Sequence, residues 1–412
     1  MGKDIIVIGA GIIGLSIALK LQSEGRSVTV IDRKGIAAEA SQGNAGAFAF
    51  SDIVPLATPG IMRRAPKWLL DPLGPLSVPP AYALKIAPWM LRLWRASWQD
   101  RYEASLAAQT QLMTVSQAAL ERQIKAVNGE GLMQRDGQLQ LYEGAREYKA
   151  SLPGWELRGE HGIQFELLDS PQKIAEIQPG LDARFTHASF TPTWMNTCDP
   201  AHWAKHIAQH FIERGGVIEM DEVKSLSQKD DQVSLATRNG EYHAKQVVVA
   251  AGAWSHQLAK TLGDKIPLET ERGYNTTLPA SAFDLKTHLT FGGHGFVVSK
   301  IAGGVRVGGA VELGGLDLAP NYKRSEILLQ KASKFLPDLN IEGGRQWMGF
   351  RPSMPDSLPV ISSAPNASNV IYAFGHGHLG LTQSAGTAEL VTALITGSET
   401  AMPLQAFSAS RF

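Results

Sequence analysis

The chain begins with an apolar run followed by a helical pattern. Residues 4–8 read Asp-Ile-Ile-Val-Ile, a β-branched run typical of a strand buried on both faces. Ile12–Glu24 has apolar positions at helical spacing, and Gly25 stands where that helix should end. Ser27–Asp32 is again rich in β-branched residues. This segment therefore predicts a strand, a helix and a second, parallel strand.

The middle of the chain changes its pattern. Between Pro55 and Pro88, repeated prolines favour loops and short turns. Ala104–Lys125 has the spacing of a long helix. Residues 131–142 and 163–168 alternate apolar and polar positions, as strands of a half-exposed antiparallel sheet do. These alternating segments predict a second sheet of a different kind.

The rest of the chain returns to the first domain and then to the second. Ala201–Arg214 predicts a helix that Gly215-Gly216 ends. Strand patterns follow in two groups, 217–220, 232–237 and 246–250, then 274–278, 295–299 and 305–309. From Asn369 a last strand leads into a final helix. We predict an α/β protein whose Rossmann-like domain is interleaved with an antiparallel-sheet α+β domain.

Composition narrows the class of protein. A chain of 412 residues is long enough for two joined domains, and its 39 basic and 39 acidic residues leave no overall field to attract nucleic acid. The single cysteine, Cys198, excludes an intramolecular disulfide and a CxxC metal site and favours a reducing compartment. No signal peptide or membrane-spanning run is evident. We expect a cytoplasmic protein that lies at most on the face of a membrane.

The first turn carries a dinucleotide-binding fingerprint. Gly9-Ala10-Gly11-Ile12-Ile13-Gly14 follows a predicted strand and begins a predicted helix. Gly9 permits the tight turn, Gly11 lets backbone amides approach a pyrophosphate, and Gly14 lets helix and strand pack closely. Asp32, at the end of the next strand, should accept hydrogen bonds from the adenosine ribose and repel a 2′-phosphate. The pattern predicts FAD or NAD and disfavours NADP.

Three further segments suit a flavin. Ser41–Gly46 is small and polar and can pass close to a flat ring system, while 246–254 is a buried strand that ends in small residues. Near the end of the chain, a strand runs into a glycine-rich turn, Gly375–Thr382, that begins a helix. A helix N-terminus at this turn can stabilise negative charge on a reduced flavin.

Together these segments make the chain resemble the D-amino-acid dehydrogenase branch of the D-amino-acid oxidase and glycine oxidase superfamily. Similar segments, in the family's order, are Gly9–Gly14 with Asp32, 41–46, 272–274, 306–309, 349–352 and 375–382. The resemblance implies an FAD-binding domain of residues 1–85, 200–262 and 345–412. It implies a substrate-binding domain of residues 86–199 and 263–344.

The resemblance also implies a set of cofactor-binding residues. We expect non-covalent FAD, because no cysteine lies near the 349–352 motif and Cys198 is far from it in sequence. The expected FAD-binding residues are Gly9, Gly11, Ile12, Ile13, Gly14, Asp32, Arg33, Ser41, Gly43, Asn44, Ala45, Gly46, Val223, Ala251, Gly252, Trp254, Gly349, Gly377, His378, Leu379, Gly380, Leu381 and Thr382. We expect no bound metal.

Three residues are the candidates for substrate chemistry. Arg351, in Gly349-Phe350-Arg351-Pro352, resembles the family's carboxylate-binding arginine, and a guanidinium grips a carboxylate with two charge-assisted hydrogen bonds. Tyr274 resembles a family tyrosine that adds a hydrogen bond to that carboxylate. His376 is the candidate base, although a histidine in this turn can equally pack, and His378 stands where the family has a small residue.

A tryptophan-rich basic stretch spans residues 61–101. It holds four of the nine tryptophans, and seven basic against two acidic residues give it a local charge of plus five. Aromatic and basic residues together are typical of a segment that sits among lipid headgroups. The alternative is a helix that packs its tryptophans into the protein with arginines outward. The resemblance favours a protein that contacts a membrane peripherally and delivers electrons to a quinone or the respiratory chain.

The leading prediction is FAD-dependent oxidative deamination of a D-amino acid, or of a cyclic D-imino acid such as a D-proline derivative. In this reaction a hydride passes from Cα to the flavin and the electrons go to a non-oxygen acceptor. The first alternative is an oxidase of glycine, sarcosine or a similar amine that uses oxygen. The second is a flavin-binding electron-transfer or regulatory subunit without turnover, in which Arg351 and Tyr274 are incidental.

Overall fold

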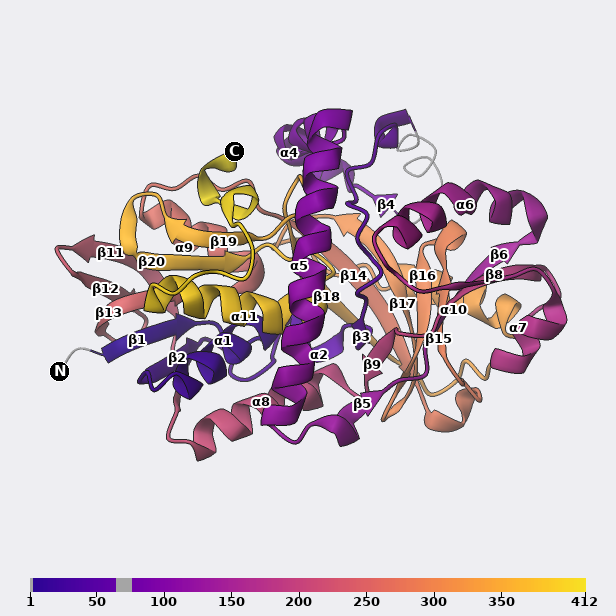
Figure 1. Ribbon diagram of the computed structural model, residues 1–412, viewed down its shortest axis with the longest axis horizontal. Coiled ribbons are helices and arrows are strands. Elements are labelled where there is room, and N and C mark those ends of the chain that lie inside the picture. Colours follow the sequence, from indigo (N-terminus) through magenta and orange to yellow (C-terminus); the bar gives the residue numbers. More distant parts are fainter. Residues whose placement is uncertain (1–2, 64–75) are drawn as a thin grey trace.

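A computed structural model describes residues 3–63 and 76–412, and it contains two large sheets side by side (Figure 1). The first sheet is mostly parallel, and its strand order is β10-β2-β1-β13-β12-β11, with β20 also paired to β13 and β19 to β20. Its strands are β1 (Lys3–Ile8), β2 (Val28–Asp32), β10 (Val217–Met220), β11 (Val223–Lys229), β12 (Gln232–Thr237), β13 (Glu241–Val249), β19 (Val360–Ala364) and β20 (Ala367–Phe374).

Helices cover both faces of this sheet. On one face α1 packs against α11 and α8, and α11 in turn packs against the long helix α5, which runs across the middle of the molecule (Figure 1). The other face is covered by the short helix α9. The bounds are α1 (Ile12–Ser23), α5 (Gln99–Ala126), α8 (Pro200–Glu213), α9 (Ser255–Thr261) and α11 (Gly380–Thr396). The predicted Rossmann-like domain is thus confirmed.

Gly9 makes the close approach of the first turn possible. Its φ of +114° is open only to glycine, and a Cβ there would lie 2.8 Å from the carbonyl carbon of Ala250 on the neighbouring strand end. The Cα of Gly14 packs onto the carbonyl of Gly9, so α1 lies tight against β1. The two glycines fix the position of the helix N-terminus.

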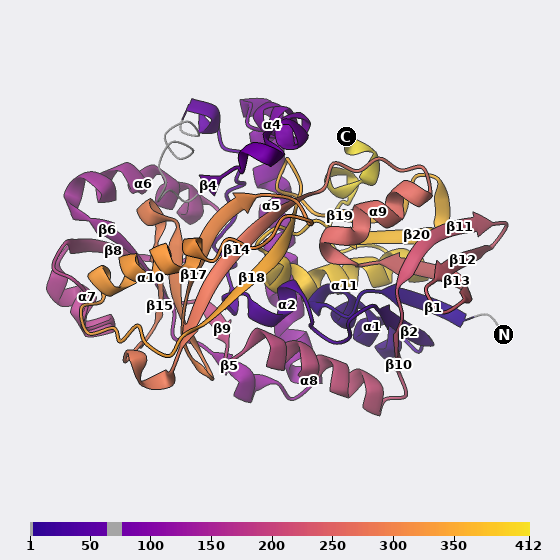
Figure 2. The same ribbon diagram turned by 180° about the vertical axis from the view of Figure 1, so that it is seen from behind.

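The second sheet is largely antiparallel and has the strand order β18-β14-β17-β16-β15-β6-β8-β7, with β4 paired to β17 (Figure 2). Its strands are β4 (Leu76–Ser77), β6 (Gln138–Glu143), β7 (Glu166–Leu168), β8 (Phe185–Thr191), β14 (Glu269–Leu278), β15 (His288–Phe291), β16 (Phe296–Ile301), β17 (Gly304–Leu313) and β18 (Arg345–Ser353). A small third sheet joins β3 (Ala47–Phe48), β9 (Met195–Thr197) and β5 (Met133–Gln134).

The two faces of the second sheet differ in polarity. One face packs an apolar core against α10 (Lys323–Phe335) and α7 (Pro171–Ile177), and residues such as Leu139, Leu289 and Val298 belong to it. Residues between these positions alternate to the opposite face, as the period of two requires. That opposite face is turned toward the first sheet. The polar positions of the strand predicted within 131–142 therefore border an internal cavity.

Sheet membership and packing differ from the domain boundaries expected from the sequence at several places, and β4, within the expected FAD-binding segment 1–85, pairs with β17 of the second sheet. The expected FAD-binding segment 345–412 begins with β18, but β18 pairs along its length with β14 of the second sheet. Helix α5 lies in the expected substrate-binding segment 86–199, but Leu112, Leu120 and Ile124 join the core of the first domain. In each case long-range packing, which composition does not reveal, decides the assignment.

Several helices fall where the sequence pattern predicted none, among them α4, α6, α7, α9 and α10. Helix α6 (Gly144–Glu160) contains Pro153, and α4 (Ala83–Ala96) contains Pro88 at the end of the proline-rich stretch. Among the described residues between Pro55 and α4, the structure shows the short strand β4 and a 3₁₀ turn, Pro80–Tyr82, in keeping with the predicted short turns, and residues 61–63 are helical. Arg64, Lys67, Trp68 and Asp71 of the tryptophan-rich stretch lie outside the described residues.

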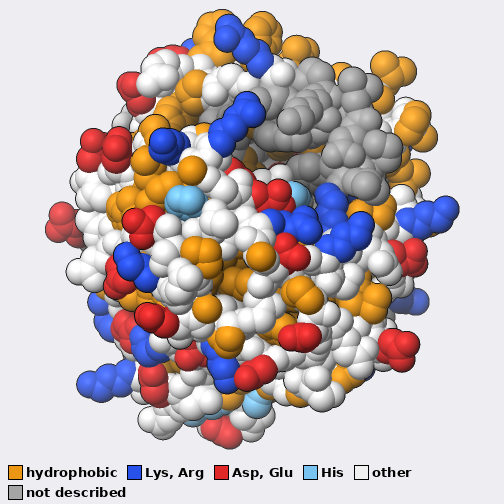
Figure 3. Space-filling model, turned by 90° about the vertical axis from the view of Figure 1, so that its right-hand side faces the viewer, with side chains coloured by type: hydrophobic (Ala, Val, Ile, Leu, Met, Phe, Trp, Pro, Cys, Tyr) orange, Lys and Arg blue, Asp and Glu red, His pale blue; other side chains and the backbone are white. Residues whose placement is uncertain are grey.

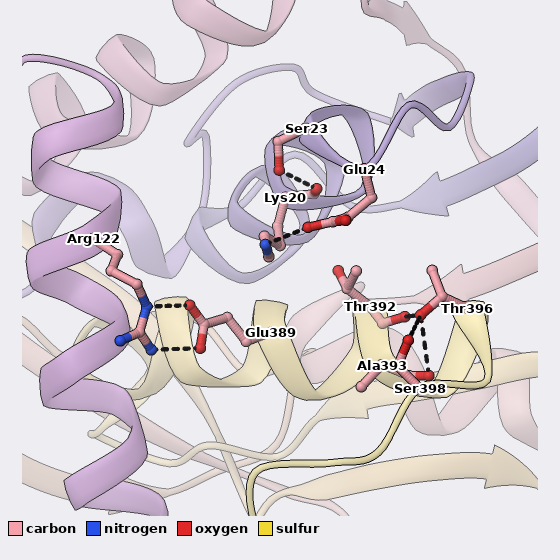
Figure 4. A network of polar contacts seen from close by, with 9 residues as sticks. All are labelled: Lys20, Ser23, Glu24, Arg122, Glu389, Thr392, Ala393, Thr396 and Ser398. Carbon is pink, nitrogen blue, oxygen red and sulfur yellow. Dashed lines mark hydrogen bonds and ion pairs between the residues drawn. The ribbon is translucent and has the colours of Figure 1, made fainter.

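Charges are spread over the surface. The face in Figure 3 carries basic and acidic side chains among apolar ones, in keeping with a net charge of zero. On the surface between α5 and α11, Arg122 forms two hydrogen bonds of 2.8 and 2.7 Å with Glu389 (Figure 4). No helix within residues 3–63 and 76–412 combines the length and the apolar character that a membrane crossing requires.

Candidate active site

A cavity of about 600 Å³ lies between the two sheets and is lined by residues of both. At one end it is lined by Asp32, Glu222 and Val223 at the carboxyl edge of the first sheet. At the other end it reaches Arg351, His378 and the polar face of the second sheet. A volume of this size is typical of a site for a cofactor or small ligand.

The N-terminus of α1 points into this cavity. Gly11, Ile12 and Ile13 line it, and the amide of Ile12 donates to the hydroxyl of Ser41 at 2.9 Å. The first amides of a helix lack intrahelical partners and carry partial positive charge, which suits a pyrophosphate. The fingerprint and the first residue of the 41–46 segment therefore meet at one point.

Asp32 fixes the adjoining loop. One carboxylate oxygen accepts a hydrogen bond from the amide of Ala10 at 2.8 Å, and the other accepts from the amides of Lys34 and Gly35 at 2.7 and 2.9 Å. The side chain also lines the cavity. Asp32 thus holds the turn together and presents negative charge where a ribose would lie.

Arg33 and Trp254 form a flat wall beside Asp32. The guanidinium carbon of Arg33 lies 3.7 Å from the centre of the Trp254 ring, and Arg33 also pairs with Glu39 at 2.9 Å. Both residues and Val223 line the cavity. A stacked cation and aromatic ring offer the kind of planar surface against which an adenine ring packs.

The 41–46 segment is tied to the second sheet. Asn275 donates to the carbonyl of Gly43 at 2.7 Å, and Arg306 donates to the carbonyl of Asn44 at 2.6 Å. Gly43 also packs on the ring of Trp347, leaving no room for a Cβ. These contacts hold the backbone of Gly43 and Asn44 at the junction of the two domains.

Most of the expected FAD-binding residues line the cavity, and four do not. The exceptions are Gly14, Gly46, Leu379 and Thr382. Leu379 is buried in an apolar cluster, and the hydroxyl of Thr382 accepts a hydrogen bond from the amide of Ala49 at 3.0 Å. In this structure Leu379 and Thr382 pack behind the residues that line the cavity.

Arg351 lies half-buried in the cavity on β18. One of its nitrogens donates to the carbonyl of Ala310 at 3.1 Å, and no carboxylate within the described residues forms an ion pair with it. Burial lowers the pKa of its guanidinium, while the charge of Glu271, its partner across β14 and β18, acts in the opposite direction. A positive charge is therefore presented to the cavity without a full counter-ion.

Tyr274 is placed differently from the expectation. Its buried hydroxyl donates to Glu312 at 3.1 Å and accepts a hydrogen bond from the amide of Asn321, also at 3.1 Å. Glu312 in turn pairs with the fully buried Arg272 at 3.2 Å. Although Tyr274 borders the cavity, the structure commits its hydroxyl to this internal network and away from a substrate carboxylate.

The two histidines of the terminal turn have opposite environments. His376 is buried, its Nε2 lies 2.9 Å from the hydroxyl of Thr387, and burial lowers its pKa to about 3. His378 is exposed to the cavity. Its pKa is lowered by desolvation, partly opposed by the charges of Asp52 and Glu271 and reinforced by Arg351. Both histidines border the cavity, and of the two His378 is the more exposed.

Several cavity residues were not among the sequence candidates. They include Asp52 and Arg158, whose side chains approach to 3.8 Å, together with Gln138, Gln140, His288 and Trp347. Period-two alternation marked 131–142 as a strand with one polar face. That signal could have identified Gln138 and Gln140, whereas Asp52 and Arg158 stand in no recognisable motif.

The lining fits FAD. The helix N-terminus, the cavity-lining Asp32 and the Arg33–Trp254 wall suit an adenosine diphosphate, and the same cavity is also lined by residues of the second sheet. Cys198 is not among the residues that line it. A dinucleotide fold whose cavity ends at an unpaired arginine defines a flavin-dependent oxidoreductase.

The chain belongs to the FAD dependent oxidoreductase family, whose model matches residues 4–394. The expected family and its FAD cofactor are confirmed. The chain is 33% identical to a D-amino-acid oxidase of Bradyrhizobium diazoefficiens, over 100% of this chain and 99% of the relative. It is 28% identical to a D-amino acid dehydrogenase of Rhizobium rhizogenes, over 99% of each chain.

Solved structures share the fold. Glycine oxidase from Geobacillus kaustophilus aligns with a TM-score of 0.78 and 21% identity, over 99% of this chain and 98% of that one. L-proline dehydrogenase from P. horikoshii aligns with a TM-score of 0.76 and 22% identity, over 100% and 98%. The fold class expected from the sequence is therefore confirmed.

Proposed function

We propose that the protein oxidises a D-amino acid, or a cyclic D-imino acid such as a D-proline derivative, to the imino acid, which water hydrolyses to the 2-oxo acid. The observation that carries the proposal is Arg351, a cavity arginine without an ion-pair partner among the described residues. A carboxylate is the group that such a guanidinium grips with two charge-assisted hydrogen bonds. The relatives named D-amino-acid oxidase and D-amino acid dehydrogenase support this substrate class.

Each cavity residue has a separate role in the proposed reaction. FAD, when bound, supplies the acceptor for the hydride that leaves Cα. Arg351 binds the substrate carboxylate and so orients Cα. The substrate ammonium must first lose a proton, and His378 faces the cavity close enough to Arg351 for the arginine charge to lower its pKa and favour the neutral imidazole. We assign the proton-accepting role to His378 and a positioning role to His376, which holds the turn through Thr387.

Anaerobic mixing of the holoenzyme with single amino acids tests the proposal. A D-amino acid should bleach the flavin absorbance and its L-enantiomer should not. Arg351→Ala should weaken substrate binding by two or more orders of magnitude, since a buried guanidinium pair is lost. If no amino acid reduces the flavin, the reading as a non-catalytic flavin-binding subunit is favoured instead. If Arg351→Ala leaves the affinity unchanged, the carboxylate assignment fails.

The electron acceptor is proposed to be a quinone or another acceptor that is not oxygen, in keeping with relatives named dehydrogenases. The alternative, direct use of oxygen, is favoured by the relative named D-amino-acid oxidase at 33% identity. Reoxidation of the reduced flavin should be followed in parallel with a soluble quinone and with air-saturated buffer. Faster reoxidation by quinone is expected, and turnover with oxygen alone would establish the oxidase.

We further propose that α4 rests on a membrane. Its inner face buries Ile86 and Trp89, but its outer face exposes Leu84 and Leu91 to 90% and 63% and Trp94 to 47%. A helix that is apolar on both sides leaves one side without a protein partner among the described residues. The same helix carries Lys85, Arg92 and Arg95. Apolar anchors among basic residues favour an anionic lipid surface.

Co-sedimentation with vesicles tests this docking. The holoenzyme should pellet with vesicles that contain anionic lipid and less with zwitterionic ones. Leu91→Glu together with Arg92→Glu should abolish pelleting, because the first change removes apolar insertion and the second reverses a charge. The matched control is Leu167→Glu, an exposed leucine on β7. Pelleting that survives the α4 changes contradicts the proposal.

A further inference from the structure

Four polar side chains line the cavity from two neighbouring strands. Gln138 and Gln140 lie on β6, and β15 pairs with it so that His288 stands opposite Gln138 and Thr290 opposite Gln140. Directly paired positions project from the same face of a sheet. All four residues line the cavity, and the intervening Leu139 and Leu289 face the apolar core. We call these four residues the polar face.

The polar face has no hydrogen-bonding partners of its own. The side chains of Gln138, Gln140, His288 and Thr290 make no hydrogen bond with any described residue, although Gln138 and His288 are only 3% and 2% exposed. Buried polar groups are nearly always paired, because an unpaired one costs roughly 1–3 kcal/mol. Two of the four, Gln138 and His288, are such groups, and the half-buried Gln140 and Thr290 extend the same face, so the face is arranged for something that enters the cavity.

The polar face adjoins the reacting end of the cavity. The ring centres of His288 and Trp194 lie 5.3 Å apart. Trp194 belongs to the same apolar cluster as Leu379, the residue that follows His378 in the terminal turn. Arg351, His378 and the polar face line one cavity, so a substrate whose carboxylate is at Arg351 has its substituent in the space that the polar face borders. Ala49 packs in the same cluster and closes this side.

Charge in this region is already balanced. Arg158 donates to the carbonyls of Ser51 and Gly154 at 3.0 and 2.9 Å and lies 3.8 Å from Asp52. Burial lowers the pKa of His288 to about 3, so its imidazole is neutral at pH 7. A charged substituent would find no free counter-ion here, whereas a neutral donor and acceptor would find amide, hydroxyl and imidazole partners.

From this geometry we infer that the polar face selects substrates that carry an uncharged hydrogen-bonding group, a hydroxyl or a carboxamide, on the side chain or ring. This inference rests on the proposed amino-acid oxidation. An apolar substituent of the same size would displace water from four polar side chains without replacing their hydrogen bonds. Sites built to hydrogen-bond a substrate discriminate strongly against analogues that lack the group.

Isosteric substrate pairs test the inference: D-threonine against D-valine, D-asparagine against D-leucine, and D-hydroxyproline against D-proline. Both the dissociation constant, from perturbation of the flavin spectrum, and kcat/KM are measured for the holoenzyme. At least one polar member should be preferred by about tenfold or more. Thr290→Val and Gln140→Leu should each reduce this preference severalfold, with FAD content retained.

Thr186→Val is the matched control, since Thr186 lies on β8 of the same sheet and does not line the cavity. It should leave the preference intact. The inference is overturned if the wild-type protein prefers the apolar member of every pair, or if the two cavity variants keep the wild-type ratio. A protein that binds the pairs with the expected ratio but never reduces its flavin contradicts the proposed oxidation and not the selectivity.

Discussion

The guanidinium of Arg351 lies against the Cα of Gly273: a Cβ built on Gly273 would stand 2.5 Å from Arg351 Cζ. The two residues come from neighbouring strands, β18 and β14, and their side-chain positions share the face that lines the cavity. The missing side chain at 273 is what allows the charged group to lie flat beside the backbone. Its place in the cavity depends on a glycine seventy-eight positions earlier in the chain.

Gly273→Ala should therefore displace the guanidinium and weaken catalysis. The methyl group has no room beside Arg351, and a displacement on the order of 1 Å at an orienting group costs about 100-fold in rate. We expect a fall of about that size in kcat/KM, mostly through KM, with FAD retained, measured by steady-state assay and flavin absorbance. Gly131→Ala, where a Cβ meets nothing within 4 Å, is the control. Unchanged kinetics for Gly273→Ala would argue against this packing.

The pH profile should report His378. Its pKa is lowered mainly by desolvation, so the imidazole is neutral at pH 7, and kcat/KM should fall as the pH drops through that lowered value. In His378→Asn no base remains, and kcat/KM at pH 7 should fall by about 100-fold. The deficit should shrink as the pH rises toward the pKa of the substrate ammonium. His243→Asn on the exposed part of β13 is the control. A deficit equal at every pH contradicts the role as base.

Two buried histidines should make the fold sensitive to acid. Burial lowers the pKa of both His376 and His288 to about 3, so between pH 6.5 and 3 the unfolded chain binds protons that the folded chain does not. Stability is then fully present above about pH 6.5 and declines as the pH falls, by up to about 1.4 kcal/mol per pH unit for each histidine. Urea unfolding at pH 7 and pH 5 measures the slope, which His288→Gln should reduce.

The parts of the site that were predicted from the sequence are local in the chain. Gly9 to Asp32 forms one continuous unit, so strand, helix and glycine turn can be read from adjacent residues. Arg351 was found because a short motif surrounds it. Its positioning against Gly273, however, needs the pairing of β18 with β14, and no local pattern specifies which distant strand is the neighbour.

The parts that were missed depend on which way a side chain points. Tyr274 lies between Gly273 and Asn275, which serve the cavity, and the pairing of β14 with β17 shifts register at this point. Its hydroxyl therefore meets Glu312 instead of the cavity. His376 and His378 both border the cavity, but the turn between them leaves His376 buried and His378 exposed. Identity and spacing alone do not fix such orientations.

Asp32→Asn should weaken both FAD binding and the hydrogen bonds that hold the turn around residue 32. The carboxylate accepts three backbone hydrogen bonds, and hydrogen bonds to a charged group are worth about 1.5–3 kcal/mol each against about 1 for a neutral one. We expect the dissociation constant for FAD, from quenching of flavin fluorescence, to rise by roughly 10- to 100-fold. Asp231→Asn, in the exposed turn between β11 and β12, should leave it unchanged. If the variant binds FAD fully and with wild-type affinity, the assignment of Asp32 to the cofactor site is wrong.

The ion pair between Arg122 and Glu389 should contribute little despite its geometry. The two side chains join α5 to α11 through hydrogen bonds of 2.8 and 2.7 Å, but the side chain of Arg122 is 60% exposed. Water and salt screen such a pair, so a double-mutant cycle of Arg122→Ala and Glu389→Ala should give a coupling of about 0.2–1 kcal/mol. The helices are held together by the buried core that Leu120 and Leu390 share. Leu120→Ala should therefore cost more, about 2–5 kcal/mol in urea unfolding, and the reverse order would contradict this account.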